Sequence, residues 1–162
     1  MTRPDGAEPG SVTPAAQPRA WRWGNVPVPE AHLGVAAAGL AIGVLRPRRI
    51  GGQPARCVGW GLVASGVALA VAATRAAGAT DLARPDHLVT SGPYARSRHP
   101  MYVAWTAIYL GFALVVRSAW LLRLTPLLAG LIHREARGEE ERLAERFGAE
   151  YDAYRARVRR YV

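Results

Sequence analysis

One polar stretch of the chain gathers residues that could bind a charged ligand and move a proton. Residues 91–94 read SGPY, a turn signal, and Arg98, His99, Pro100 and Tyr102 follow it closely. Pro100 suits the first turn of a helix, where its missing N–H costs nothing. The pattern therefore places a guanidinium, an imidazole and the Tyr94 and Tyr102 phenols around one helix start. A simple helix cap at His99 is the structural alternative.

A second polar stretch lies in the tail, where we predict a helix from Ile132 to Phe147. Gly148 ends this helix, and a second short helix carries two tyrosines. Helical spacing places Glu140 on one face with the apolar residues Ala136, Leu143 and Phe147. A carboxylate on an apolar face needs a partner. Glu140 is therefore a candidate functional acid.

The neighbouring acids Glu139 and Glu141 are predicted to lie nearer to water. Pairing with Arg142 and Arg146 is a sufficient explanation for acids on a solvated helix face. For Glu139, this structural interpretation and a functional one both remain open.

Four apolar segments must position these residues, at about 31–45, 57–74, 101–116 and 120–132. The second and third hold no charge and lack the polar face of a soluble amphipathic helix. Crossing a bilayer takes about 20 residues, so the first and fourth need arginines that reach the headgroups. We expect an all-α polytopic membrane protein, with about four transmembrane helices and a C-terminal amphipathic cytoplasmic helix pair. A soluble helical bundle is the alternative.

Small residues within these segments favour close contacts between helices. Gly39 with Gly43, and Gly61 with Ser65, have the spacing of helix packing motifs. Both pairs are predicted to lie at helix–helix contacts.

Arginine placement predicts the orientation. All 21 basic residues are Arg, and the net charge is +9. With four spans, the six arginines at 46, 48, 49, 56, 117 and 123 lie on one side and the others lie on the opposite side. The positive-inside rule then places both termini in the cytoplasm of a multi-pass protein in the cytoplasmic membrane. The four arginines of the 46–56 loop run against the rule.

The rest of the composition fixes the domain organisation. Residues 1–29 are predicted to be a disordered leader, and residues 30–162 a single membrane domain. The single cysteine, Cys57, has no intramolecular disulfide partner and excludes a multi-cysteine metal site. Because it begins an apolar run, we predict a small buried hydrophobe there. No metal site is predicted.

The two polar stretches together resemble a known family. Gly92-Pro93-Tyr94, the block from Arg98 to Tyr102, Glu139-Glu140 and Phe147-Gly148 are similar, in this order, to the isoprenylcysteine carboxyl methyltransferase and phospholipid methyltransferase superfamily. The resemblance covers about residues 80–160. It implies an integral membrane methyltransferase that uses S-adenosylmethionine.

The resemblance also implies a set of site residues. Cofactor binding is expected from Arg98, His99, Pro100, Tyr102, Glu139 and Glu140, and the sulfonium of the cofactor would also tolerate the face of Tyr94. His99 and Glu140 are the expected catalytic residues. The chain has no glycine-rich nucleotide-binding motif, so the sequence does not support binding of this cofactor by a Rossmann fold.

Partners and alternatives follow from the same features. Expected partners are the lipid bilayer and a lipophilic or small-molecule methyl acceptor, whose carboxylate, amine or thiol stays open. One alternative is a non-catalytic membrane protein that keeps the fold. A second is a basic nucleic-acid-binding protein, but the arginines of the tail are interleaved with acids, so no nucleic acid is expected.

Overall fold

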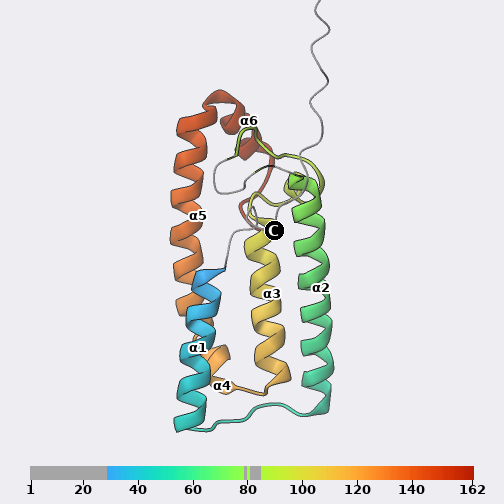
Figure 1. Cartoon of the computed structure of the whole chain (residues 1–162), viewed down its shortest axis with the longest axis vertical. Helices are drawn as coiled ribbons and strands as arrows, with labels where there is room; N and C mark the ends of the chain where they lie inside the picture. The colour runs from blue at the N-terminus through green and yellow to red at the C-terminus, as the bar shows by residue number, and fades with distance from the viewer. Residues whose placement is uncertain (1–28, 79, 81–84) are drawn as a thin grey trace, which may run out of the picture.

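The computed structural model describes residues 29–78, 80 and 85–162, in which helices stand side by side in an elongated bundle (Figure 1). The predicted leader lies outside these residues, except for Pro29. In the described part the only β pairing is two isolated bridges, so the all-α prediction is confirmed there. The elements are α1 Glu30–Leu45, α2 Gln53–Ala77, the 3-10 helix η2 Gly92–Ala95, α3 Pro100–Val115, α4 Ala119–Arg123, α5 Thr125–Phe147 and α6 Ala149–Arg157.

Length and composition single out one membrane helix. Among the described helices, only α2 is both long and apolar enough to cross a bilayer. Helices α1 and α3 are apolar but have 16 residues each, a rise of about 24 Å. The predicted four spans are therefore not confirmed by this measure.

The fourth apolar segment and the tail helix are one element. Helix α5 begins at Thr125, has Pro126 in its first turn and continues through Ile132 to Phe147. The predicted boundary at Ile132 was therefore wrong. A change from apolar to charged residues alters what a helix faces without breaking its hydrogen bonds. Gly148 ends α5 as predicted, with a φ of 50° that favours glycine.

Glycines bring α2 and α3 into close contact. A Cβ atom on Gly111 of α3 would lie 2.6 Å from the carbonyl oxygen of Gly59 on α2. One on Gly66 would lie 2.7 Å from the Ala104 carbonyl oxygen. By contrast, a Cβ on Gly61 would meet nothing within 4 Å, so the predicted Gly61–Ser65 step does not make this contact.

The first glycine pair behaves differently. A Cβ on Gly39 would lie 2.6 Å from the Leu121 side chain, so Gly39 packs α1 against α4. Its predicted companion Gly43 has more room, since a Cβ there would lie 3.8 Å from the Ser118 hydroxyl. The close contact on α1 is therefore centred on Gly39.

Much of the apolar surface of the bundle faces outward. Cys57 is exposed, contrary to its predicted burial, because α2 buries only a narrow face of small residues against α3. Large exposed apolar residues occur on α1, α2, α3 and α5, namely Leu33, Leu40, Val44, Leu45, Val58, Trp60, Val67, Val71, Phe112 and Leu127. An apolar surface of this extent is typical of a protein that contacts lipid.

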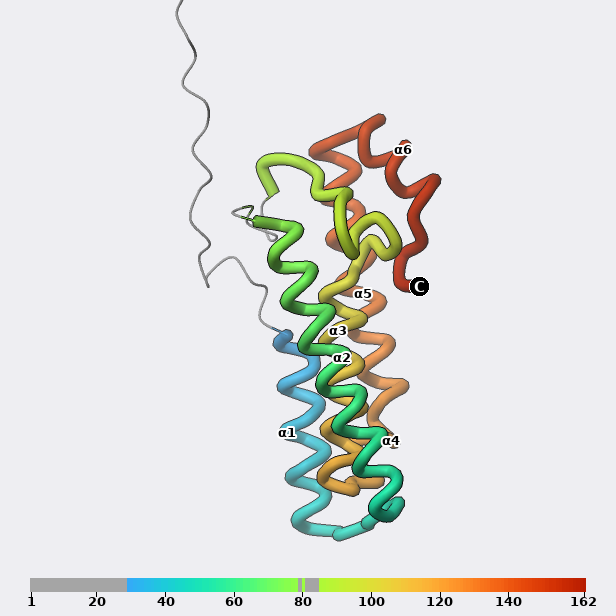
Figure 2. The backbone as a smooth tube through the Cα atoms, turned by 90° about the vertical axis from the view of Figure 1, so that its right-hand side faces the viewer, coloured from blue at the N-terminus to red at the C-terminus, as the bar shows by residue number. Residues whose placement is uncertain are grey.

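Beyond α6 the chain turns back toward the start of α3 (Figure 2). Ser97 and Arg159 form a parallel β-bridge there. The backbone N–H of Arg98 donates to the Arg159 carbonyl at 2.9 Å, and that of His99 donates to the Arg160 carbonyl at 3.2 Å. This pairing fixes the returning segment, residues 158–161, beside the first polar stretch.

Candidate functional site

The start of α3 is held by side chains as well as by the bridge. The Ser97 hydroxyl accepts a hydrogen bond from the His99 N–H at 3.2 Å and donates to the Arg160 carbonyl at 3.3 Å. Pro100 is fully buried in the first turn of α3, as its position predicts. The backbone around His99 is therefore fixed on both sides.

Glu140 of α5 is the centre of the site. Arg160 donates to both of its carboxylate oxygens, from Nε to Oε1 and from a terminal nitrogen to Oε2, each at 2.8 Å. His99 Nε2 and an Arg98 terminal nitrogen each lie 3.1 Å from Oε1. The predicted helix face is confirmed at Ala136 and Glu140, which are buried, whereas Leu143 and Phe147 are half-buried. One buried carboxylate thus faces three basic side chains.

These neighbours control the charge of Glu140. Burial raises the pKa of its carboxyl group, but the hydrogen bonds from Arg160 and His99 and the charge of Arg98 lower it more. The net result is a pKa below the ordinary value, so Glu140 is a carboxylate at neutral pH.

His99 lies between the two acids. Its Nε2 faces Glu140, while its Nδ1 lies 3.5 Å from the Glu139 carboxylate. Glu139 retains 31% exposure of its side chain, against 11% for Glu140. The ring of His99 is 5.5 Å from that of Tyr102 and 6.2 Å from that of Tyr161, between centroids. Glu139 is therefore the more exposed of the two acids.

Tyrosines close the side of the site near η2 and α6. Tyr94 is buried against Ala73 and Met101, and its carbonyl accepts a 2.7 Å hydrogen bond from the Tyr154 hydroxyl. Burial raises the pKa of Tyr151 to about 12. The Tyr151 hydroxyl and Arg98 Nε are buried and have no hydrogen-bond partner among the described residues. Buried polar atoms without a partner indicate a place where a ligand could supply the hydrogen bonds.

The structure thus unites most of the predicted residues. Arg98, His99, Glu139 and Glu140 lie together, and Tyr102 contributes a ring beside His99. Tyr94 belongs to a neighbouring apolar cluster with Ala73 and Met101. Its backbone carbonyl accepts the hydrogen bond from the Tyr154 hydroxyl. Sequence reasoning missed Arg160 and Tyr161. The need of Glu140 for a partner was visible in the sequence, but the identity of that partner depended on the return of the chain.

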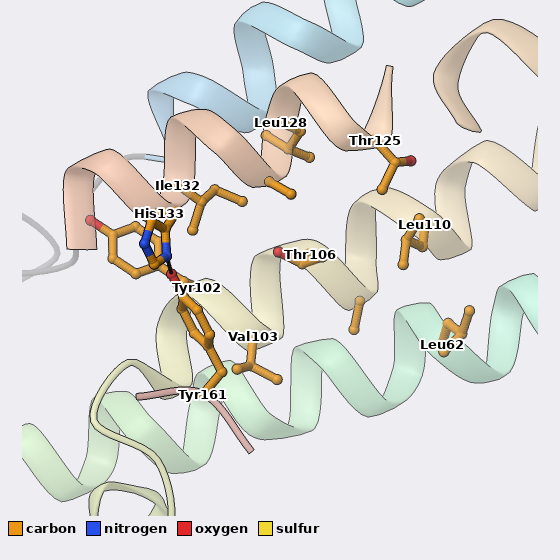
Figure 3. A pocket seen from close by; sticks show the side chains of 12 residues that line it. Leu62, Tyr102, Val103, Thr106, Leu110, Thr125, Leu128, Ile132, His133 and Tyr161 are labelled. Carbon is orange, nitrogen blue, oxygen red and sulfur yellow. Dashed lines mark hydrogen bonds between the residues drawn. The ribbon is translucent and has the colours of Figure 1, made fainter. Parts of the chain in front are cut away.

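An apolar cavity of about 620 Å³ lies beside the site, between α3 and α5, and Leu62 of α2 closes part of its wall (Figure 3). Tyr102, His133 and Tyr161 lie together at one end of it (Figure 3). The Tyr161 hydroxyl is 3.4 Å from His133 Nδ1. The cavity therefore has a long apolar wall and one polar end.

The chain matches a known protein family over more than half of its length. The model of the phospholipid methyltransferase family matches residues 54–150, from α2 to the first residues of α6. The chain belongs to this family. Neither the search of curated proteins nor that of solved structures gave a match. The predicted resemblance is confirmed at the family level, and membership indicates a membrane methyltransferase. Methyltransferases of the family generally use S-adenosylmethionine.

Proposed function

We propose that this protein transfers a methyl group from S-adenosylmethionine to a lipophilic acceptor held in the cavity between α3 and α5. One observation carries the proposal. Tyr102 and Tyr161 line the cavity, and both rings also lie beside His99 of the charged site. An acceptor in the cavity and a cofactor at the start of α3 would meet across these two rings.

The residues present fit the cofactor. Arg98 and Tyr151 offer buried polar atoms that have no partner among the described residues and are suited to a carboxylate or a hydroxyl group. Glu139 offers an open carboxylate for an amino group or ribose hydroxyls, and aromatic faces near His99 suit a cationic sulfur. When bound, S-adenosylmethionine supplies an activated methyl group on its sulfonium. The protein then binds, orients and excludes water.

We assign different roles to the two acids. The Glu140 oxygens are already contacted by the side chains of Arg160, His99 and Arg98. Glu140 therefore serves as a positioning residue that fixes these three groups. His99 directs Nε2 toward Glu140 and Nδ1 toward Glu139. His99 and Glu139 are then the groups that contact the cofactor directly, with Pro100 and Tyr94 shaping the surroundings.

The cavity favours a lipophilic acceptor over a free polar metabolite. Its lining in the described part of the chain holds no Asp, Glu or Arg, and the polar groups there are hydroxyls and the His133 ring. An acceptor with an apolar body would therefore place its nucleophilic atom beside His133 and Tyr161. Which nucleophile it carries, a carboxylate, an amine or a thiol, is what an acceptor screen identifies.

We also propose a four-span arrangement with both termini in the cytoplasm. Between Arg56 and Arg75, α2 rises about 28 Å, close to a hydrocarbon core of about 30 Å. Helices α1 and α3 and the apolar part of α4 and α5 would span beside it, with arginines at their ends reaching the headgroups. Reporter fusions in the 46–52 loop and after Val162 should report opposite sides. The same side for both would contradict this arrangement.

The decisive test uses the full chain purified in detergent. Retention of radiolabelled S-adenosylmethionine is expected from the wild type and should be weakened in His99→Ala, and thermal melts check that the variant stays folded. A screen for label transfer to lipid extracts, prenylcysteine analogues and lipophilic thiols then identifies the acceptor. Cofactor binding without transfer to any acceptor would favour a non-catalytic protein. The absence of cofactor binding would overturn the proposal.

A further inference from the structure

At the end of the bundle opposite His99, two loops are tied into one platform. Arg49 and Ser118 form an antiparallel β-bridge. The Ile50 N–H donates to the Arg117 carbonyl at 3.1 Å, and the Ala119 N–H donates to the Arg48 carbonyl at 3.0 Å. These bonds join the loop between α1 and α2 to the loop between α3 and α4. We call residues 46–51 and 116–119 the distal platform.

Two side chains reinforce the distal platform. Arg117 donates from Nε to the Ile50 carbonyl at 3.2 Å and from a terminal nitrogen to the Gly51 carbonyl. Trp120 Nε1 donates to the Arg46 carbonyl at 2.7 Å. Arg117 also has a φ of 59°, the only positive value on a non-glycine residue in the described part of the chain. A conformation that costs energy persists only where its surroundings hold it, so the distal platform is a built structure.

The distal platform carries positive charge without a counter-charge. Six arginines lie on it or beside it, at positions 46, 48, 49, 56, 117 and 123, while the sequence has no Asp or Glu at 31–80 or 87–134. None of the six makes an ion pair with another described residue. Arg48 and Arg49 are both exposed and adjacent. The charge of this surface calls for an external anion.

A small pocket joins this charge to apolar surface. It measures about 200 Å³, and its lining combines Arg48, Arg49 and Arg117 with Leu40, Gly43, Val44, Pro47, Val116 and Ser118. Val44 is 82% exposed, and its neighbour Leu45 is 81% exposed. The lining of the pocket thus combines arginines with exposed apolar residues. An anionic lipid combines matching features, a phosphate in its headgroup and apolar acyl chains beside it.

We propose that the distal platform binds the phosphate of an anionic phospholipid, between Arg48 and Arg49, with an acyl chain along Leu40 and Val44. From His99 to Val116, α3 and its flanks extend about 25 Å, so this lipid would lie in the leaflet opposite the methyl-transfer site. The inference rests on the membrane embedding proposed above and not on methyl transfer. It also accounts for the four arginines of the 46–56 loop, which run against the positive-inside rule.

The test measures lipid retention by the full chain. Protein purified in a neutral detergent is titrated with phosphatidylglycerol or phosphatidylcholine, and bound lipid is counted by native mass spectrometry. The wild type should retain phosphatidylglycerol in preference. The double variant Arg48→Gln/Arg49→Gln should lose about tenfold or more in that affinity, since each arginine near an anionic lipid contributes substantially. Its binding of S-adenosylmethionine should be unchanged, which separates this proposal from the proposed function.

Matched controls decide between a site and diffuse charge. Arg134→Gln/Arg137→Gln removes the same charge from exposed positions of α5 at the other end and should keep the preference. Arg48→Lys/Arg49→Lys should keep most of it. Millimolar inorganic phosphate at constant ionic strength should not displace the lipid, whereas displacement would indicate a small-anion site and overturn the proposal. Equal retention of the two lipids by the wild type, or an equal loss in the α5 control, would also overturn it, even if the glutamine pair fails to fold.

Discussion

Arg160 binds both carboxylate oxygens of Glu140, at 2.8 Å each, although the two residues lie on different elements and 20 positions apart. The paired geometry matches a planar guanidinium to a planar carboxylate, the strongest form of this contact. It ties the returning segment to α5 at the point where Glu140 also meets His99 at the start of α3. Three parts of the chain therefore depend on one carboxylate.

The first prediction tests the returning segment. Arg160→Ala should lower the affinity for S-adenosylmethionine about tenfold, because losing a charge-assisted pair costs roughly 1.5–3 kcal/mol and frees Glu140 to move. The neighbouring Arg159→Ala is the matched control, since the exposed Arg159 side chain makes no ion pair with another described residue and its carbonyl alone takes part in the bridge. Calorimetry on both variants decides. Equal losses would show that the segment acts only through general charge.

The second prediction separates the two acids. Glu140→Gln should lower the melting temperature by about 4–8 °C, because the partly buried Arg98 and Arg160 then lose the carboxylate that they share. Glu139→Gln should leave the melting temperature within about 2 °C, since partly exposed pairs contribute little. It should instead weaken cofactor binding. Thermal melts and cofactor retention are measured on both, and a stable Glu140→Gln protein would contradict the positioning role.

The third prediction concerns pH. The pKa of the Glu140 carboxyl lies below its ordinary value of 4.5 in the folded protein, so its ionised form favours folding. This contribution is fully present above pH 4.5 and is lost as the pH falls below it, through the folded-state pKa. Melting temperatures of the wild type should therefore fall toward acid more steeply than those of Glu140→Gln. Parallel curves for the two proteins would place the acid sensitivity elsewhere.

The sequence predicted the residues of the site better than their partners. Helical spacing placed Glu140 on the buried face, because burial of one face follows from local periodicity. Arg160 could not be predicted from such a pattern, since its contact depends on α6 and the bridge at Ser97 reversing the chain. The boundary at Ile132 failed for a related reason. Hydropathy reports the surroundings of a helix, whereas the continuity of α5 depends on backbone hydrogen bonds.

The fourth prediction tests the cavity as the acceptor site. Ala129 of α5 lines it, so Ala129→Phe should fill part of the apolar space and lower methyl transfer at subsaturating acceptor about tenfold. Cofactor affinity should stay within about twofold, because Ala129 does not contact the charged site. Ala68→Phe, on the exposed surface of α2, is the control for added bulk. A loss of cofactor binding in Ala129→Phe would mean that the cavity belongs to the cofactor.

The last prediction tests the glycine contact that holds α2 against α3 and thereby sets the place of His99. At Gly111 an added Cβ would lie 2.6 Å from the Gly59 carbonyl oxygen and 2.8 Å from the Val63 backbone nitrogen. Neither backbone atom can move away without shifting a helix. Gly111→Ala should therefore lower the stability by about 1–3 kcal/mol, the usual cost of overpacking, despite the better helix propensity of alanine.

Gly61→Ala provides the matched control on the same pair of helices. Because a Cβ there would meet nothing within 4 Å, only the propensity gain remains, and the melting temperature should stay equal or rise slightly. Thermal melts and cofactor retention are compared for the two variants in one detergent. If the two substitutions lower the melting temperature equally, α2 and α3 do not meet at Gly59 and Gly111, and the placement of His99 at the start of α3 loses its support.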